Sequence, residues 1–426
     1  MSPAEPPSAR AGRTRVRFRV LGMLVLLAGI TYLDRVCIAV TAPLMSGELG
    51  LSRMQMSLVF SAFTLAYAFF EIPTGWWGDR VGTRRVLTRI VAWWSTFTVL
   101  TGVAFSYPSL LATRFLFGAG EAGAWPNVAR TLSRWFPQRE RGTAQGVFFM
   151  GAHLAGGVTP LLVTALLAHF HWRVLFLMFG SIGFLWAGAW WHWFRDEPAG
   201  HPAVGAEEIK YIHSGRQAAA GPGHQTSWIR LLANPSVLAL CAMYFTQTYG
   251  FSFYVTWLPS YLKTTRGFSS FTLGVLAGLP LTLSVLADLF GGLTTDRLSR
   301  RFGLRIGRAS VGGGSLACAG IFLIAGTFSP DPLWGAVLIA LAAAASNFLL
   351  GASWGASVDL GGSHAGMVSA AMNTAGQIGG FLSPIVLAWG VDRYGSWTGP
   401  LYLTGALYLA GAVCWIWVDP SRRISD

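Results

Sequence analysis

The segment GWWGDRVGTRR at residues 75–85 follows one apolar run, and GLTTDRLSRR at residues 292–301 follows another. Each holds a glycine, then an Asp-Arg pair, then two adjacent basic residues, in the same order. Asp79 and Asp296 are 217 residues apart, which is about half of the 426-residue chain. Because one loop signature occurs once in each half, the chain is predicted to contain a parallel internal repeat, an architecture of membrane transporters.

The apolar runs around these loops are long enough to cross a bilayer, which takes about 20 mostly apolar residues. Only 12% of the residues are charged, against roughly 25% in soluble domains, which argues strongly against a soluble enzyme. The sequence predicts an all-α membrane protein with twelve transmembrane helices in two six-helix bundles. The predicted spans are residues 20–41, 57–77, 86–105, 108–129, 142–170, 172–194, 237–262, 271–295, 309–328, 333–356, 367–389 and 401–418.

The basic residues are distributed unevenly around these spans. Of the 31 Lys and Arg residues, 24 fall on one side, five on the other, and Arg35 and Arg114 lie within spans. Because cytoplasmic loops are enriched in Lys and Arg, both termini are expected in the cytoplasm and the protein in the cell inner (plasma) membrane. The expected organisation is a tail at 1–19, a bundle at 20–194, a cytoplasmic linker at 195–234, a second bundle at 235–418 and a tail at 419–426.

Ionisable side chains inside spans cost roughly 2.5–3.5 kcal/mol each on insertion scales and therefore mark functional sites. They are Asp34, Arg35, Glu71, Arg114, Glu121 and Asp288, all but the last in the first half. The charges of two acids, Asp34 and Glu121, and two bases, Arg35 and Arg114, sum to zero at a common site. A carboxylate that enters this site adds a net negative charge, which protonation of Asp34 or Glu121 removes. This predicts proton–anion symport. Buried structural ion pairing stays open as the alternative, most evenly for Asp288.

With these residues in place, the chain resembles the anion:cation symporter branch of the major facilitator superfamily. The resemblance rests on the two repeated loops, on YLDR at 32–35, on SAF at 61–63 with Tyr67 and Pro73, and on RFLFGAGEA at 114–122. It implies the major facilitator fold, two six-helix bundles around a central cavity that work by alternating access. The branch includes bacterial permeases for galactonate, hexuronates and glucarate, and the animal vesicular glutamate and sialic acid transporters.

The resemblance also implies a role for each matching residue. Asp34 and Glu121 would be the protonatable coupling acids, and Arg35 and Arg114 would bind the substrate carboxylate or pair with these acids. Tyr32 and Tyr67 would line the substrate site. The inter-helix gating motif would comprise Gly75, Asp79, Arg80, Arg84, Asp296 and Arg297. Glu71 stands where many members have a neutral amide, which leaves the proton stoichiometry open.

The second-half spans offer neutral hydrogen-bonding side chains and no base to the expected cavity. Those expected at the substrate are Gln247, Ser353, Asn373 and Gln377. Asn373 and Gln377 are four residues apart and share a helical face. Neutral groups suit hydroxyls, so the expected substrate is a polyhydroxylated carboxylate, a sugar acid. Hydrogen bonding between helices by the same groups is an equal alternative.

No pattern indicates an enzyme, a cofactor or a metal site. The sequence has no Gly-rich phosphate loop ending in Lys-Ser/Thr, so ATP-driven transport is not supported. His169 and His171 lack a further ligand at metal-binding spacing, and His153, within the fifth span, is better placed for function. The expected partners are a small organic anion, protons and membrane lipid, without nucleic acid, and a monomer is expected. The alternatives are an organic-anion exchanger, a proton-driven exporter, or a non-transporting membrane receptor.

Overall fold

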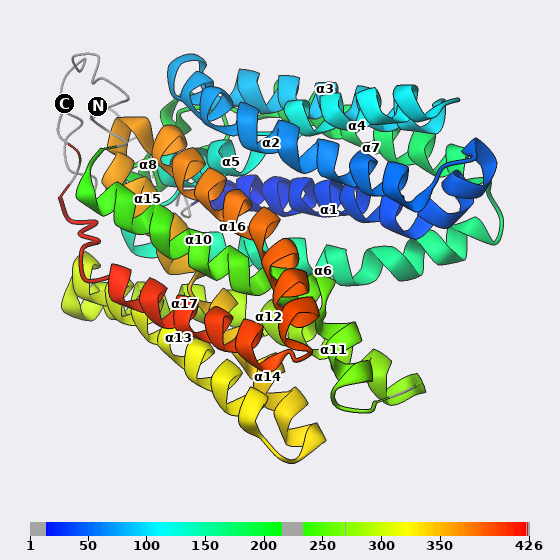
Figure 1. The fold of residues 1–426 in the computed structure, drawn as a ribbon. Helices are drawn as coiled ribbons and strands as arrows, with labels where there is room; N and C mark the ends of the chain where they lie inside the picture. The colour runs from blue at the N-terminus through cyan, green and yellow to red at the C-terminus, as the bar shows by residue number, and fades with distance from the viewer. Residues whose placement is uncertain (1–13, 215–232, 269, 423, 425–426) are drawn as a thin grey trace, which may run out of the picture.

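The computed structural model describes residues 14–214, 233–268, 270–422 and 424, and all regular elements among them are helical (Figure 1). The rest of the predicted tails and linker lies outside these described residues. The first half comprises α1 (Val16–Leu49), α2 (Arg53–Val81), α3 (Thr83–Gly102), α4 (Tyr107–Glu121), α5 (Ala124–Trp135), α6 (Arg141–Leu167) and α7 (Trp172–Trp193). The second comprises α10 (Pro235–Thr256), α11 (Leu258–Thr264), α12 (Ser270–Phe302), α13 (Leu304–Phe328), α14 (Pro332–Phe348), α15 (Leu350–Gly361), α16 (Ala365–Tyr394) and α17 (Thr398–Cys414). The linker contains α8 (Ala206–His213).

The predicted all-helical architecture is confirmed, but three of the predicted spans are each divided into two helices. The breaks separate α4 from α5, α10 from α11 and α14 from α15. At the first break Gly123 has φ +85°, which a glycine adopts without steric cost. At the second, Pro259 lies in the first turn of α11, where its missing N–H is tolerated. With each divided pair counted once, the described helices of the two halves, α8 of the linker left aside, form twelve segments.

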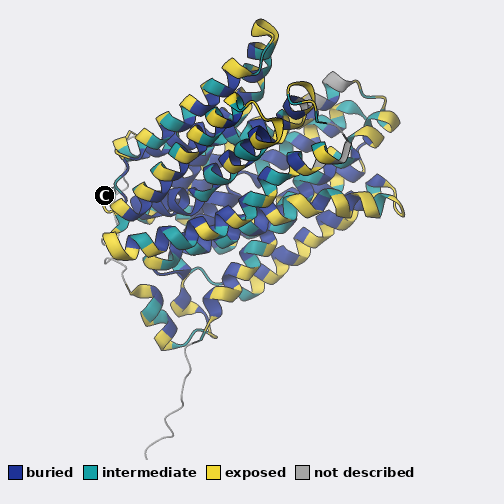
Figure 2. Cartoon of the chain, turned by 90° about the horizontal axis from the view of Figure 1, so that it is seen from below, coloured by how far each residue is buried: buried dark blue, intermediate teal, exposed yellow. Residues whose placement is uncertain are grey.

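The outer surface is apolar. Seven stretches of the described helices are long and apolar enough to cross a bilayer, and the last, Pro332–Tyr394, covers α14, α15 and α16. Figure 2 shows exposed residues along the outward faces of the helices and buried residues inside. The exposed side chains include Phe69, Leu161 and Leu185. A surface of large apolar side chains of this extent suits lipid and not water.

Helices of the two halves pack most extensively at two crossings, in which α6 packs against α12 and α2 packs against α16. In Figure 1 the two groups of helices converge at the end where α5, α8 and α15 lie and spread apart toward the other end. Glycines allow the close approach: a Cβ at Gly75 would lie 2.7 Å from the carbonyl oxygen of Gly366, and one at Gly292 would lie 2.4 Å from that of Gly142. Gly75 and Gly292 open the two repeated sequence segments, so the repeat extends to the packing of the backbone.

Replacing Gly292 by alanine is expected to lower the midpoint of thermal unfolding, because the new methyl group must push α12 away from α6. Overpacking of this kind costs about 1–3 kcal/mol. The matched control is Gly278→Ala in the same helix, where an added Cβ meets nothing within 4 Å. Thermal unfolding of the purified protein in detergent measures both variants, and equal midpoints would show that the crossing tolerates a side chain.

Candidate functional site

Helices α1 and α4 bring the four charged residues singled out from the sequence into one cluster. Arg35 donates from Nε to Oε1 of Glu121 at 2.5 Å, and its Nη2 lies 2.5 Å from the same oxygen. The charges of Asp34 and Glu121 both act on the guanidinium of Arg114. Asp34, Arg114 and Glu121 are buried, whereas the side chain of Arg35 is 21% exposed. Arg35 is therefore the member of the cluster that an entering ligand reaches most directly.

Several polar atoms in this cluster have no hydrogen-bond partner among the described residues. They include both carboxylate oxygens of Asp34, Nε of Arg114 and Oε2 of Glu121. The hydroxyl of Thr98 lies near Asp34 but donates to the carbonyl of Trp94 at 3.0 Å. A buried unsatisfied polar group costs about 1–3 kcal/mol, and a charged one costs more. A cluster with this many unmet hydrogen bonds is suited to receive a ligand and protons that supply the missing partners.

Aromatic rings surround the guanidinium group of Arg35. Its Cζ lies 5.1 Å from the ring centroid of Phe63, 5.0 Å from that of Tyr67 and 5.7 Å from that of Trp125. Such contacts attract a cation and keep water away from it. Tyr67, expected at the substrate, is buried with its hydroxyl unpartnered among the described residues. Tyr32 is half-buried, and its ring lies 6.3 Å from that of Trp125.

Glu71 connects the two halves. Its Oε1 accepts a hydrogen bond from Nδ2 of Asn373 at 2.5 Å, and its Oε2 accepts one from the hydroxyl of Thr374 at 3.2 Å. Glu71 comes from α2 and both donors come from α16, so the bonds cross between the halves. The amide of Asn373, which was expected at the substrate, is thus engaged by a carboxylate in this conformation.

Of the other second-half residues expected at the substrate, two already make hydrogen bonds with described residues of the protein and one does not. Gln247 donates from Nε2 to Oδ1 of Asn347 at 3.1 Å. The hydroxyl of Ser353 donates to the carbonyl of Leu350 at 3.2 Å. Gln377 is half-buried, and the described residues offer it no hydrogen bond. Gln377 is therefore the one of these side chains whose amide is available to a ligand without breaking an existing bond.

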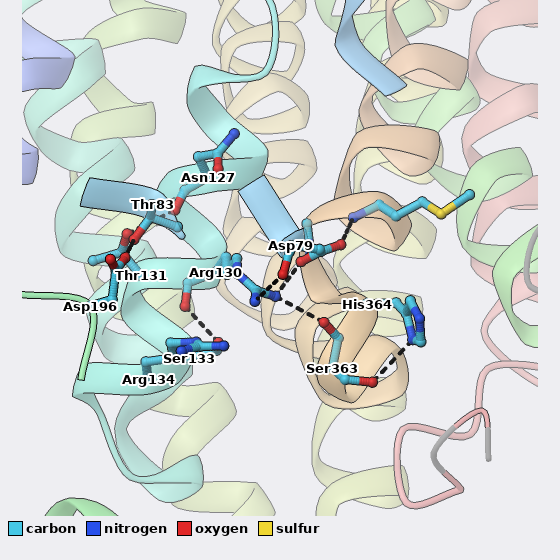
Figure 3. Close-up of polar contacts among 12 residues, drawn as sticks. Asp79, Thr83, Asn127, Arg130, Thr131, Ser133, Arg134, Asp196, Ser363 and His364 are labelled. Atoms are coloured by element: carbon cyan, nitrogen blue, oxygen red, sulfur yellow. Dashed lines mark hydrogen bonds and ion pairs between the residues drawn. The ribbon is translucent and has the colours of Figure 1, made fainter. Parts of the chain in front are cut away.

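Asp79, near the end of α2, binds the N-terminus of α16. Its Oδ1 accepts from the backbone N–H of Gly366 at 3.1 Å and its Oδ2 from that of Met367 at 2.9 Å. Arg130 of α5 donates to the same carboxylate and also, at 2.9 Å, to the carbonyl of Ser363 (Figure 3). Helix N-termini attract anions because their first N–H groups are unpaired. Asp79 and Arg130 together therefore hold α2 and α5 of the first half against α16 of the second.

Asp296, near the end of α12, makes the equivalent contact from the second half to the first. It accepts from the backbone N–H groups of Gly142 at 3.0 Å and Thr143 at 2.6 Å, at the N-terminus of α6. In both cases the donors are the second and third residues of a long helix in the other half. We call the contacts of Asp79 and Asp296 the two latches, and the end of the molecule that holds them the latch end.

A buried ion-pair network lies beside the latches, and the sequence reasoning missed it. Asp359 of α15 accepts from Nη1 of Arg141 at 2.5 Å and from Nη2 of Arg308 at 2.6 Å. All three residues are buried. The two arginines, like Arg130, belong to the 24 basic residues that lie outside the predicted spans on the expected cytoplasmic side. The sequence feature that could have indicated this network is Asp359 itself, an acid that directly follows the largely apolar residues 350–358.

The basic residues of the gating motif stay on their own half. Arg84 donates from Nη2 at 2.5 Å and from Nε at 2.9 Å to the carbonyl of Trp191 in α7. The guanidinium of Arg80 lies 4.1 Å from the ring centroid of Trp76, and Arg297 is exposed. Among the charged residues of the two repeated segments, the carboxylates therefore make the contacts between the halves.

The Asp79→Asn variant is expected to shift the protein toward a conformation that is open at the latch end. It replaces charge-assisted hydrogen bonds, worth about 1.5–3 kcal/mol, by neutral ones. Double electron–electron resonance between labels at Arg80→Cys and Arg301→Cys, in a background without the four native cysteines, should show longer distances than in the parent. Asp392→Asn, an exposed acid elsewhere on α16, should leave the distances unchanged. Identical distances in all three proteins would show that the Asp79 latch does not hold this end closed.

Residues 24–384 match the model of the Major Facilitator Superfamily. The probable sulfoacetate transporter SauU of Cupriavidus necator is 36% identical over 420 residues, which cover 97% of this chain and 96% of that protein. The probable galactarate/D-glucarate transporter GudP of Bacillus subtilis is 29% identical over 434 residues, which cover 97% of this chain and 94% of that protein. The solved structure of the proton:xylose symporter XylE has the same fold, with a TM-score of 0.73 at 13% identity over 95% of this chain and 97% of its own.

Proposed function

The chain belongs to the major facilitator superfamily, and from this premise we propose that it is a proton-coupled symporter that imports a small organic anion by alternating access. Membership confirms the predicted fold and the predicted class, a multi-pass membrane transporter and not an enzyme. We place it as a monomer in the inner membrane. The latch end would face the cytoplasm, because the loops expected at that end carry most of the basic residues.

The observation that carries the proposal is the ion pair between Arg35 and Glu121, next to the unpartnered carboxyl of Asp34. An anion that binds Arg35 competes with Glu121 for the same guanidinium. Once displaced, Glu121 would be a buried carboxylate without its partner, which is strongly unfavourable. A proton on Glu121 or Asp34 removes that charge. Anion binding and proton binding therefore favour each other.

The latches supply the conformational side of the cycle. In the present conformation both hold the latch end closed, so the anion would enter from the opposite, outer side. Two conformations of similar free energy are enough for transport when ligand binding favours their interconversion. Neutralising the cluster between α1 and α4 removes the charge that would otherwise oppose closure of the outer side around the ligand.

The first candidate substrate class is sugar acids, as the neutral second-half groups suggest and as the relative named a galactarate/D-glucarate transporter supports. A second candidate class is short anions with two acidic groups. The relative named a sulfoacetate transporter supports it at 36% identity. So does the engagement of Gln247, Ser353 and Asn373 in internal hydrogen bonds, since this leaves fewer groups for substrate hydroxyls.

Uptake by the purified protein in liposomes tests the proposal. With an acidic exterior, labelled D-glucarate, D-galactonate or sulfoacetate should accumulate above its outside concentration, and a protonophore should abolish the accumulation. Counterflow without any dependence on a proton gradient would instead indicate an anion exchanger. Outward pumping against the proton gradient would indicate an exporter, and binding without transport would indicate a receptor.

A further inference from the structure

A buried histidine–aspartate pair joins the two halves near the cluster that contains Arg35 and Glu121. Nδ1 of His153, on α6, lies 2.5 Å from Oδ2 of Asp288, on α12. The side chain of His153 is 6% exposed and that of Asp288 is 0% exposed. The other carboxylate oxygen of Asp288 has no partner among the described residues. Neither residue belongs to the latches or to the Arg35 cluster, so the pair is a separate titratable site between the halves.

The pair lies next to the proposed anion site. The ring of His153 is 6.2 Å from that of Tyr32, which in turn lies 6.3 Å from that of Trp125. The ring of Trp125 faces the guanidinium of Arg35 at 5.7 Å. The hydroxyl of Tyr32 is subject to the charges of Arg35, Glu121 and Asp288 together. Tyr32 and Trp125 thus connect the Arg35 cluster to the histidine–aspartate pair through successive ring contacts.

The groups that face the pair come from each neighbouring helix. Tyr32 comes from α1, and Phe251 and Tyr244 come from α10. The ring of Phe251 lies 5.8 Å from that of His153. The Tyr244 hydroxyl is engaged by Nε1 of Trp354 on α15 at 3.0 Å. Asp288 is the charged group that acts on His153. The protonation of this pair is therefore governed by its own two members and by what occupies the space beside it.

The chemistry of the pair depends on whether it holds an extra proton. Asp288 occupies the Nδ1 side of the ring, which leaves Nε2 for a second partner. Without the extra proton, Nδ1–H donates to the carboxylate and Nε2 presents a lone pair, which repels an anion. With the proton, Nε2 carries hydrogen and donates to an anion, whichever member of the pair holds the shared proton. The pair can therefore accept an anion only after it has accepted a proton.

We propose that His153 is a second, proton-dependent binding point for the substrate, which contacts the distal acidic group of a dianion whose first acidic group binds Arg35. This inference rests on the proposed function and specifies the substrate class, anions with two acidic groups. Asp288 is the positioning residue, since it orients the ring and binds the proton jointly with it. Each acidic group of the substrate then enters with one proton, so that two protons accompany a dianion and the buried charge stays constant.

The test compares anions that differ by one acidic group, D-glucarate with D-gluconate and sulfoacetate with acetate, using dissociation constants of the purified full-length protein at pH 6 and pH 8. In the wild type the dianion should bind more tightly than its monoanion partner at pH 6, and the advantage should shrink at pH 8. His153→Leu should weaken dianion binding by about ten- to a hundredfold, the loss of a charge-assisted hydrogen bond, and should leave monoanion binding within twofold.

Asp288→Asn provides a second variant with a different expected result. The asparagine amide can donate to Nδ1, which fixes hydrogen on Nε2 of neutral His153. Dianion binding should therefore persist, and its advantage over the monoanion should no longer change between pH 6 and pH 8. Equal weakening of both members of an anion pair by His153→Leu would overturn the inference. So would a dianion advantage that still shrinks at pH 8 in Asp288→Asn. So would wild-type protein that binds dianions no more tightly than monoanions, a result that leaves the proposed function intact. If none of the four anions binds, the proposed function fails as well.

Discussion

Replacing Arg35 by alanine is expected to abolish anion uptake, because it removes the most accessible cation of the buried cluster. It is also expected to destabilise the protein, since Glu121 is 0% exposed and loses the ion pair at 2.5 Å. Leaving one member of a buried pair without its partner costs about 3–5 kcal/mol. Uptake of labelled anion into liposomes and the midpoint of thermal unfolding are the two measurements.

The two effects can be separated with a double variant. Arg35→Ala with Glu121→Gln removes both charges, so we expect the unfolding midpoint to return most of the way to that of the wild type while uptake remains absent. Arg393→Ala, which removes an exposed arginine from α16, is the control for loss of positive charge and should transport normally. Uptake by the Arg35→Ala single variant at more than about a tenth of the wild-type rate, a loss of less than 1.4 kcal/mol, would place the anion elsewhere.

The second large effect is expected for Asp34→Asn, which should abolish proton-driven accumulation of a monoanion such as D-galactonate and leave counterflow of the same anion in place. Asp34 is buried, and both carboxylate oxygens lack a partner among the described residues. Asparagine has nearly the same shape and stays neutral, so it imitates the protonated acid permanently. The anion can then cross in either direction, but its movement no longer carries a proton at this position.

A matched comparison makes this prediction specific. Glu48→Gln neutralises an acid in the same helix, one that pairs with Arg173 at 2.9 Å near the end of α1, and it should keep gradient-driven accumulation. Proton flux recorded with a pH-sensitive dye inside the liposomes should fall in Asp34→Asn and not in Glu48→Gln. If Asp34→Asn still accumulates the anion as the wild type does, Glu121 alone or another acid couples the proton.

Much of the architecture follows from local properties of the chain. A run of about 20 apolar residues crosses a bilayer wherever it occurs in the sequence, and the matching segments at 75–85 and 292–301 reveal the repeat without knowledge of any contact. The cost of ionisable groups in lipid likewise singled out Asp34, Arg35, Arg114 and Glu121. Since Arg114 and Glu121 are seven residues apart on α4, helical periodicity alone places them on one face.

The partners of the polar side chains were not predictable in the same way. Glu71 and Asn373 are 302 residues apart in the chain, and His153 and Asp288 are 135 apart. Whether such residues meet depends on how two helices are rotated about their axes and shifted along each other. Packing of many small residues sets those quantities, among them Gly75 and Gly292, and no single stretch of sequence encodes them.

The packing of the helices also explains why some residues have other partners than the sequence led us to expect. Asn373 and Gln247 had the right chemistry for a sugar acid, but the neighbouring helices place a carboxylate and an amide within reach of them. Asp359 lies just beyond the predicted span at residues 333–356, and only the fold brings Arg141 and Arg308 to it. Hydrophobicity along the chain is enough to place the membrane-spanning segments, although not the breaks that divide three of them into two helices. The pairing of charges and amides between them required the packed structure, because a hydrogen bond forms only where two helices hold its donor and acceptor about 3 Å apart.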